Sequence, residues 1–139
     1  MSKSVKVLFE FGTIYGREFG CFTLTESLLE KLRRMQTSYP YGVSRVRMRI
    51  DVPIMFLVRR KSFLKHFKPI LSVTPYAIPN PELVESSQRA KTNGILYVER
   101  SGRVSMEAFL PTDEDNVVQH YGCGIGTITQ LSRLLQRPN

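Results

Sequence analysis

Strict alternation of apolar and other side chains is the feature that most limits what this chain can fold into. Near the N-terminus four apolar residues stand at every second position: Val5, Val7, Phe9 and Phe11. The same period returns in Val43–Ile50, where Val46, Met48 and Ile50 alternate with three arginines. Successive side chains of a strand point to opposite faces, so this period predicts strands with one buried face. In the first strand the intervening residues, Leu8 among them, are then expected to face outward.

Further strands are predicted between glycines and prolines. A short strand, Glu18–Phe22, is expected to pair with the first one through a glycine-bearing turn. Pro53 interrupts ladder pairing, which predicts an edge, a bulge or a new strand, and Ile54–Val58 follows as a strand buried on both faces. A hairpin is predicted near the C-terminus, opened by Asn93-Gly94, with arms Ile95–Glu99 and Val104–Leu110 around a turn at Arg100–Arg103.

Two segments follow helical spacing instead. The first, Thr23–Met35, starts with residues that fit a capping box, Thr23 to Glu26. Its apolar stripe consists of Leu24, Leu28, Leu29, Leu32 and Met35. The second helix starts with another capping box, Thr127 to Gln130, and its inward side chains are Ile128, Leu131, Leu134 and Leu135. These elements predict a single α+β domain over residues 1–139, a mostly antiparallel β-sheet flanked by two α-helices.

A long, flexible, Pro-containing loop is predicted at about residues 74–93. Prolines break regular structure in its first half, and residues 85–93 are polar. Loops of this length are usually functional or disordered. Tyr76, Ile78 and Pro79 lie in an extended stretch that another copy of the chain could grip, so they are the candidate self-association residues. The alternative is a solvent-exposed loop without a partner.

The formal net charge of +8 is unevenly distributed. Residues 31–68 hold eleven basic residues and one acidic residue, which gives +10, so the remainder of the chain carries −2. Such a concentration attracts polyanions, either nucleic acid or an anionic lipid surface, in a salt-dependent way. The alternative is a solvated basic surface that has no partner. The candidate anion-binding residues are Arg45, Arg47, Arg49, Arg59, Arg60, Lys61, Lys65 and Lys68.

Two parts of this basic segment have a pattern of their own. The alternating arginines of Val43–Ile50 are expected to line one face of one strand at intervals of about 6.6 Å. Residues 59–68 interleave basic side chains with Phe63 and Phe67 as a short amphipathic helix or turn. Its apolar side either closes the core or enters a bilayer interface, so the two phenylalanines are candidate membrane anchors. The acidic residues 113–115 are expected in a solvated loop, or opposite the basic segment of a neighbouring copy.

The sequence offers little that resembles a catalytic centre. Cys123 and His120 are the nearest candidate nucleophile and base, but such a pair needs a thiolate. The glycines of 122–126 resemble a phosphate-binding loop without the lysine and spacing of a P-loop, and a simple turn into the last helix explains them as well. The cysteines and histidines lack zinc-site spacing, and the carboxylates are scattered. We therefore expect a non-enzymatic protein with no catalytic residue, cofactor or metal site.

The cellular setting is predicted from the cysteines and the apolar runs. Two cysteines cannot form a disulfide framework, which favours a reducing compartment, either the cytoplasm or a virion. The first residues lack the apolar core of a signal peptide, and the longest apolar run, Val52–Val58, is too short to span a membrane. We expect an intracellular protein, not classically secreted and without a transmembrane segment, that is capable of peripheral membrane attachment.

The order of elements resembles that of rhabdovirus matrix proteins over about half of the chain. An aromatic strand, Val7–Phe11, leads through Arg17–Phe19 and Cys21–Thr23 into the helix that ends at Met35, and a basic strand then precedes a proline-bearing loop. The lysine-rich N-terminal arm and the Pro-Pro-x-Tyr motif of that family are missing. The resemblance implies a protein that polymerises, coats a nucleocapsid and adheres to the inner leaflet of a membrane.

These observations favour a basic structural and assembly protein of viral-matrix-like type. It is expected to bind an anionic membrane, a nucleocapsid or both, and to form a homo-oligomer. The alternative is an RNA-binding accessory protein, such as a silencing suppressor or a ribonucleoprotein component, that uses the same basic face on phosphates. Salt dependence alone does not separate the two, because counterions are released in both cases.

Overall fold

The computed structural model describes residues 3–13, 16–38, 48–57, 75–78, 88–111 and 118–136. Within these ranges the chain forms seven strands and two helices. In chain order they are β1 (Ser4–Thr13), β2 (Gly16–Thr25), α1 (Glu26–Thr37), β3 (Met48–Leu57), β4 (Tyr76–Ala77), β5 (Gln88–Val98), β6 (Arg103–Pro111), β7 (Val118–Thr127) and α4 (Ile128–Gln136). All pairs of neighbouring strands that define this sheet are antiparallel. The expected α+β fold, a mostly antiparallel sheet flanked by two helices, is therefore confirmed.

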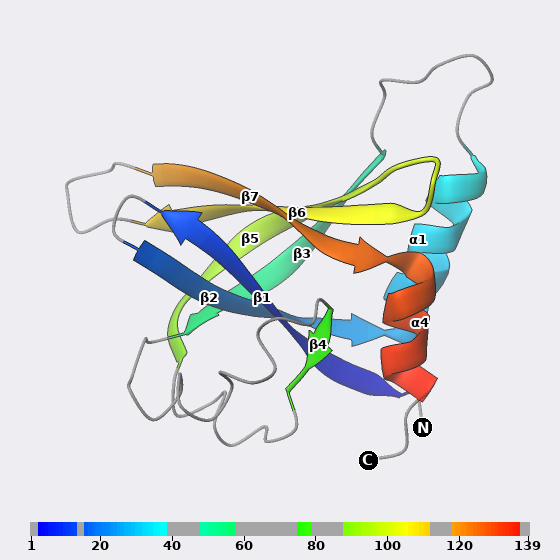
Figure 1. Ribbon diagram of the computed structural model, residues 1–139, viewed down its shortest axis with the longest axis horizontal. Coiled ribbons are helices and arrows are strands. Elements are labelled where there is room, and N and C mark those ends of the chain that lie inside the picture. Colours follow the sequence, from blue (N-terminus) through cyan, green and yellow to red (C-terminus); the bar gives the residue numbers. More distant parts are fainter. Residues whose placement is uncertain are drawn as a thin grey trace.

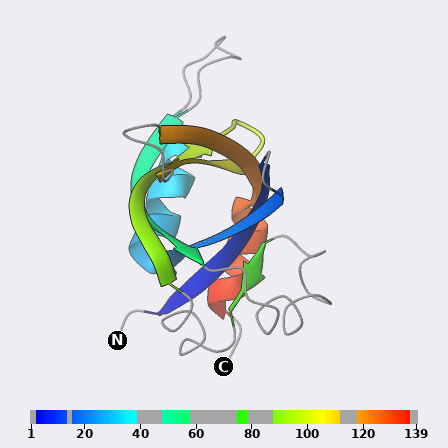
Figure 2. The ribbon, with the colours of Figure 1, turned by 90° about the vertical axis from the view of Figure 1, so that its left-hand side faces the viewer.

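The sheet curls on itself until its two ends approach each other (Figures 1 and 2). Its strand order is β4-β1-β2-β3-β5-β6-β7, and β7 comes to lie beside β1. The short strand β4 lies at this seam, where Ala77 pairs with Val7 of β1 and Pro75 packs against Gly126 of β7. The segment 75–78 therefore contacts both sides of an almost closed barrel.

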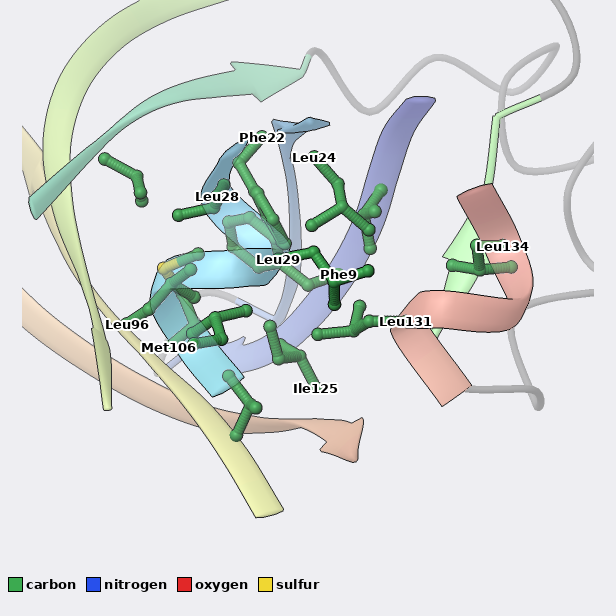
Figure 3. Close-up of a cluster of buried hydrophobic side chains, with 14 of the residues drawn as sticks. Phe9, Phe22, Leu24, Leu28, Leu29, Leu96, Met106, Ile125, Leu131 and Leu134 are labelled. Carbon is green, nitrogen blue, oxygen red and sulfur yellow. The ribbon is translucent and has the colours of Figure 1, made fainter. Parts of the chain in front are cut away.

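The main core fills the space between the inner face of the sheet and the two helices (Figure 3). Helix α1 buries Leu28, Leu29 and Leu32 there, as its stripe predicts. Helix α4 buries all four of its predicted inward residues: Ile128, Leu131, Leu134 and Leu135. Each fully buried side chain of this size contributes about 1.5–3 kcal/mol, so this cluster is the main favourable term in folding.

A second apolar cluster lies on the outer face of the sheet, where β4, β1, β2 and β3 run side by side. Its buried members are Leu8, Phe19, Cys21, Leu57 and Ile78. Leu8 is only 3% exposed, so the prediction that β1 has one buried face is wrong at this residue. The period of two still holds, because Val7 and Phe9 face the inner core while Leu8 faces the outer cluster. Strands near the seam are thus apolar on both sides.

Strand β3 runs without interruption through Pro53. Pro53 lies opposite Asn93 of β5, so the prediction of a separate strand after the proline is wrong. Pairing of β3 with β2 begins only at Met55, which leaves one edge of β3 without a ladder at Pro53. A proline, which lacks an N–H, is tolerated at such an edge. Of the three explanations predicted for Pro53, an edge, a bulge or a new strand, the edge is therefore confirmed. Beyond it, Ile54 and Phe56 pack in the inner core and Leu57 in the outer cluster, as predicted for a strand buried on both faces.

Strand β5 is longer than the hairpin pattern predicts. It begins at Gln88, and segment 75–78 contains β4, so the prediction of a loop over 74–93 is wrong in both of these parts. Asn93 and Gly94 lie inside β5, and the β5–β6 ladder begins at Gly94, so the predicted opening of the hairpin is confirmed. A Cβ at Gly94 would overlap Cδ1 of Ile54, so this glycine is needed for close packing between strands and not for a turn. The predicted turn at Arg100–Arg103 is confirmed, with Gly102 at φ 92°.

The two helix starts differ in how well the capping boxes predict them. At α4 the box is complete, because Thr127 N–H donates to Oε1 of Gln130 at 2.9 Å and Gln130 N–H donates to Oγ1 of Thr127 at 3.2 Å. At α1 the predicted box is wrong. Thr23 pairs with Lys6 inside the β1–β2 ladder, and Thr25 is the N-cap, whose Oγ1 accepts the N–H of Leu28 at 3.1 Å. Strand pairing up to Thr25 delays the start of the helix by two residues.

Candidate anion-binding surface and an adjoining depression

Most residues assigned to anion binding lie outside the described residues. These are Arg45, Arg47, Arg59, Arg60, Lys61, Lys65 and Lys68, together with the candidate membrane anchors Phe63 and Phe67 and the candidate self-association residue Pro79. The acidic residues 113–115 also lie outside. Arg49, Tyr76 and Ile78 belong to the described part of the chain, and their surroundings are known.

Arg49 lies on the outer face of β3, as the alternation predicts, while Ile50 packs toward the inner core. Its guanidinium donates a hydrogen bond of 2.9 Å to Oδ1 of Asp51, which is two residues along the same face. This hydrogen bond, and then the charge of Asp51, raises the pKa of Arg49. Because both side chains are largely exposed and screened by solvent, the pair adds little to stability. Its main effect is to offset the charge that Arg49 offers to an anion.

Tyr76 and Ile78 pack against their own chain. Ile78 is 6% exposed within the outer cluster, and its N–H donates to the carbonyl oxygen of Lys6 at 2.9 Å. Tyr76 pairs with Leu8 and is half-buried against the same cluster, which raises the pKa of its phenol. In this arrangement both side chains contribute to closing the seam of the sheet.

Exposed cations also gather on the two helices. We call the set Lys31, Arg33, Arg34 and Arg133 the basic helix surface. Arg33 of α1 donates to Oγ of Ser132 at 3.0 Å, so Arg33 lies next to the part of α4 that carries Arg133. Arg34 is only loosely paired with Glu30, at 3.6 Å and with both side chains exposed. This surface carries four cations on elements that the core holds rigidly.

The turn between β5 and β6 joins both helices. The carbonyl oxygen of Arg100 accepts a hydrogen bond from Nε2 of Gln36 near the end of α1, at 3.0 Å. The carbonyl oxygen of Gly102 accepts the N–H of Ile128, the first residue of α4, at 2.9 Å. Arg100 and Arg103 are exposed at this turn and extend the positive charge beyond the basic helix surface. Sequence reasoning missed this contribution, because only tertiary contacts bring the turn and α4 to the helix that starts the basic segment.

A depression of about 360 Å³ lies on the other side of the sheet, over β3, β5 and β6. It is lined by Arg49, Asp51, Val52, Pro53, Asn93, Ile95 and Phe109. The β5–β6 ladder extends only from Gly94 to Val98, although β5 starts at Gln88 and β6 runs on to Pro111. The depression therefore lies where these two strands part, beyond the pair Gly94–Ala108.

Phe109 gives this depression its character. Its side chain is 36% exposed, and among the described residues it is the exposed large apolar side chain. Sequence reasoning missed it, although a signal was present: Val104, Met106 and Ala108 alternate into the core, and the same period directs Phe109 outward. The sequence places Asn93 at the end of the predicted loop, where the hairpin opens, and gives no sign that it lies beside Phe109.

The candidate catalytic and metal-binding features do not converge on a site within the described residues. Burial raises the pKa of Cys123 to about 11, so its thiol stays protonated at neutral pH. Cys123 and His120 both belong to β7, and the glycines of 122–126 lie in that strand, paired with β6. The prediction of a glycine-rich turn there is wrong. Over the described ranges, no group of three or more His, Cys, Asp or Glu residues could hold a metal ion.

The described helices are also too short or too polar to cross a membrane. No protein-family model, curated protein or solved structure matches this chain.

Proposed function

We propose that this protein is a non-enzymatic, basic structural and assembly protein of viral-matrix-like type, which binds an anionic membrane or a nucleocapsid and self-associates. The observation that carries the proposal is the placement of the positive charge. The segment 31–68 holds +10 of formal charge, and its described start presents Lys31, Arg33 and Arg34 on the exposed side of α1. A field of this kind raises the local concentration of polyanions and speeds their binding.

Rigid support of these cations strengthens the proposal. Helix α1 is fixed by its buried leucines, and Arg33 is held by Ser132 of α4. An anion that binds there does not have to order the backbone first, which lowers the entropic cost of association. Arg45 and Arg47 precede β3 in sequence and belong to the proposed anion-binding set with the basic residues of 59–68.

The test is a paired binding assay, flotation with neutral and anionic vesicles beside gel shifts with RNA at two ionic strengths. The variant Lys31→Glu/Arg34→Glu should weaken binding to both anionic vesicles and RNA, because it reverses two exposed charges of the basic helix surface. Lys3→Glu/Lys6→Glu is the matched control, since it changes the net charge equally, directly before β1 and within it. Equal losses for the two variants would show that only net charge matters and would overturn the role of the helix surface.

Arg49 provides a finer test of the strand face. Because Asp51 already offsets its charge, Arg49→Glu should weaken binding less than Lys31→Glu, and Asp51→Asn should strengthen it. The triple change Arg45→Glu/Arg47→Glu/Arg49→Glu tests the whole face. Unchanged binding to both vesicles and RNA in that variant would remove the arginine strand from the proposed site.

Self-association is tested by sedimentation over a wide range of protein concentrations at low salt. A matrix-like protein should form higher oligomers as concentration rises. Monomeric behaviour over the whole range would contradict the assembly part of the proposal while leaving anion binding in place.

The second candidate function is that of an RNA-binding accessory protein. One observation favours it: Phe109 is exposed beside Asn93 and Arg49, and aromatic side chains on sheet surfaces commonly stack on unpaired bases. RNA binding without vesicle flotation in the paired assay would favour this function over the matrix-like one.

A further inference from the structure

Two neighbouring rows of side chains form the outer face of β3, β5 and β6 at the depression. In the first row, Ile95 lies between Asp51 of β3 and Glu107 of β6. In the next row, Pro53 pairs with Asn93, and Phe109 of β6 lines the same depression. Neighbouring strands are about 4.8 Å apart, so each row is about 10 Å wide. This is the width of a flat ring that rests on one or two side chains.

The lining suits a flat, polar-edged ligand. Phe109 offers an aromatic surface that is 36% exposed, and Ile95 and Pro53 supply an apolar floor. The side chain of Asn93 is exposed and carries both a donor and an acceptor, which pair well with the edge of a nucleobase. A base has both features, a π-face and a hydrogen-bonding edge, and stacking on an aromatic ring tolerates any of the bases.

The charged residues around the depression favour an uncharged base at its centre and a phosphate at its rim. Asp51 and Glu107 flank Ile95, so a phosphate is disfavoured at the centre. Lys91 lies at the rim instead, four residues from Ile95 on the same face of β5, about 13 Å away. At the other end, opposite Tyr97, Arg49 is paired with Asp51 and offers little charge to a phosphate.

The same charges argue against a lipid headgroup in the depression. Its phosphate would approach the two carboxylates, and a single phenylalanine offers little area for insertion into a bilayer. An uncharged ring avoids that repulsion.

We propose that this depression binds an unpaired nucleobase of a single-stranded nucleic acid, stacked on Phe109 with its edge at Asn93, while the backbone follows the rim near Lys91. The inference rests on the nucleic-acid form of the proposed function and adds to it a site that recognises bases in addition to charge.

The experiment compares two oligonucleotides that have the same number of phosphates, one with bases and one abasic, in RNA and in DNA form. The wild-type protein should bind the base-containing strand about 5- to 150-fold more tightly, the range expected for stacking of one base. Phe109→Ala should abolish this difference and leave the affinity for the abasic strand unchanged. Phe109→Trp should retain it, and Phe109→Leu, which keeps an apolar side chain without a ring, should lose most of it.

Matched controls keep the result interpretable. Tyr76→Leu changes an aromatic residue on β4, away from the depression, and should preserve the preference for bases. Asn93→Ala should alter the ranking among bases without changing abasic binding. Thermal unfolding of each variant checks its fold, and Phe109→Trp retains a test of the site even where Phe109→Ala unfolds. Comparing the RNA and DNA arms shows which sugar the site accepts.

Several outcomes overturn the inference. Equal binding of base-containing and abasic strands by the wild type would do so while leaving polyanion binding intact. Phe109→Ala that weakens both strands alike, or that changes self-association or vesicle flotation and leaves the preference for bases, would assign Phe109 to another contact. If neither oligonucleotide binds but anionic vesicles do, this inference fails and the membrane form of the proposed function stands. If all three fail to bind, both are wrong.

Discussion

Gly94→Ala tests the strand register on which the depression depends. Gly94 has no positive φ, so alanine fits the backbone there, and at an unobstructed position this change stabilises a protein by about 0.4–1 kcal/mol. In this structure the new Cβ would overlap Cδ1 of Ile54, lie 2.6 Å from its Cγ1 and lie 3.2 Å from the carbonyl oxygen of Glu107. Ile54 is 1% exposed and has no free space into which to turn. Whether Gly94→Ala raises or lowers the free energy of unfolding therefore tests whether Ile54 packs directly against Gly94.

We expect Gly94→Ala to destabilise the fold by about 1–3 kcal/mol, the usual cost of overpacking a core. For a chain of this length that corresponds to a fall in melting temperature of roughly 3–4 °C for each kcal/mol. Urea denaturation followed by circular dichroism measures the change directly, with an unchanged m-value as evidence that the unfolded state is unaffected. Gly12→Ala is the matched control, because its Cβ would meet nothing within 4 Å.

A double-mutant cycle identifies the cause of the cost. Ile54→Ala alone should cost about 2–5 kcal/mol, because it opens a cavity in the core. In that background Gly94→Ala should cost less than in the wild type, with a coupling of about 0.5–3 kcal/mol, since the clashing atoms are gone. Stabilisation by Gly94→Ala, or simple additivity of the two changes, would refute the contact. A register shifted by one residue would also move Asn93 and Ile95 to the opposite face and remove the depression.

Three further predictions concern the caps, the seam and the cysteines. Thr25→Ala should cost about 1 kcal/mol in urea denaturation, because it removes the N-cap of α1, whereas Thr23→Ala should change stability by less than about 0.5 kcal/mol; the reverse order would restore the predicted capping box. Gly126→Ala should destabilise by about 1–3 kcal/mol, since Gly126 has φ 112° and its Cβ would lie 2.6 Å from Cδ of Pro75; a neutral result would contradict the closed seam. Burial raises the pKa of Cys21 and of Cys123 to about 11, so both thiols should react slowly with alkylating reagents at neutral pH. Because the unfolded thiols lose their protons first, near pH 9, stability should fall as pH rises from about 9 to 11; a thiolate absorbance that titrates below pH 9 would refute this.

Helix α4 and the first hairpin were predictable because their signals are local. The box from Thr127 to Gln130 needs only the residues of one turn, and its inward stripe follows from spacing alone. In the same way, β1 pairs with β2 across a connection of two residues, so neighbours in sequence become neighbours in the sheet. No distant contact changes these local preferences, and the prediction holds.

The errors occur where a distant partner decides. The predicted loop runs to Asn93, yet β3 pairs with β5 back to Gln88, so Asn93 and Gly94 lie in the middle of β5, where Ile54 packs over the glycine. Pro53 is expected to break a strand, but β2 leaves that edge of β3 unpaired, so the proline does no harm. Sequence patterns indicate which conformation a segment prefers on its own. In this curled sheet, packing against another strand, or the absence of a paired strand, changes the outcome.

The candidate site shows the same division. The outward position of Phe109 follows from the period of β6 and was predictable, whereas its neighbours Asn93 and Asp51 come from two other strands and depend on register. Arg49 was assigned correctly to an outer face, but its ion pair with Asp51 changes its role. A count of charges along the chain does not distinguish an arginine that has a carboxylate beside it from one that does not.

Within the described residues, exposed cations therefore lie on two sides of one sheet. On the helix side, Lys31, Arg33 and Arg133 are exposed on elements fixed by the main core, and their attraction for a polyanion is screened by salt. On the outer side, Arg49 is offset by Asp51, and what the surface offers instead is the ring of Phe109. Stacking depends far less on salt than phosphate binding does, so affinity that survives at high ionic strength belongs to the outer side. Salt titration of the base-containing and abasic strands thus separates the two surfaces within a single protein.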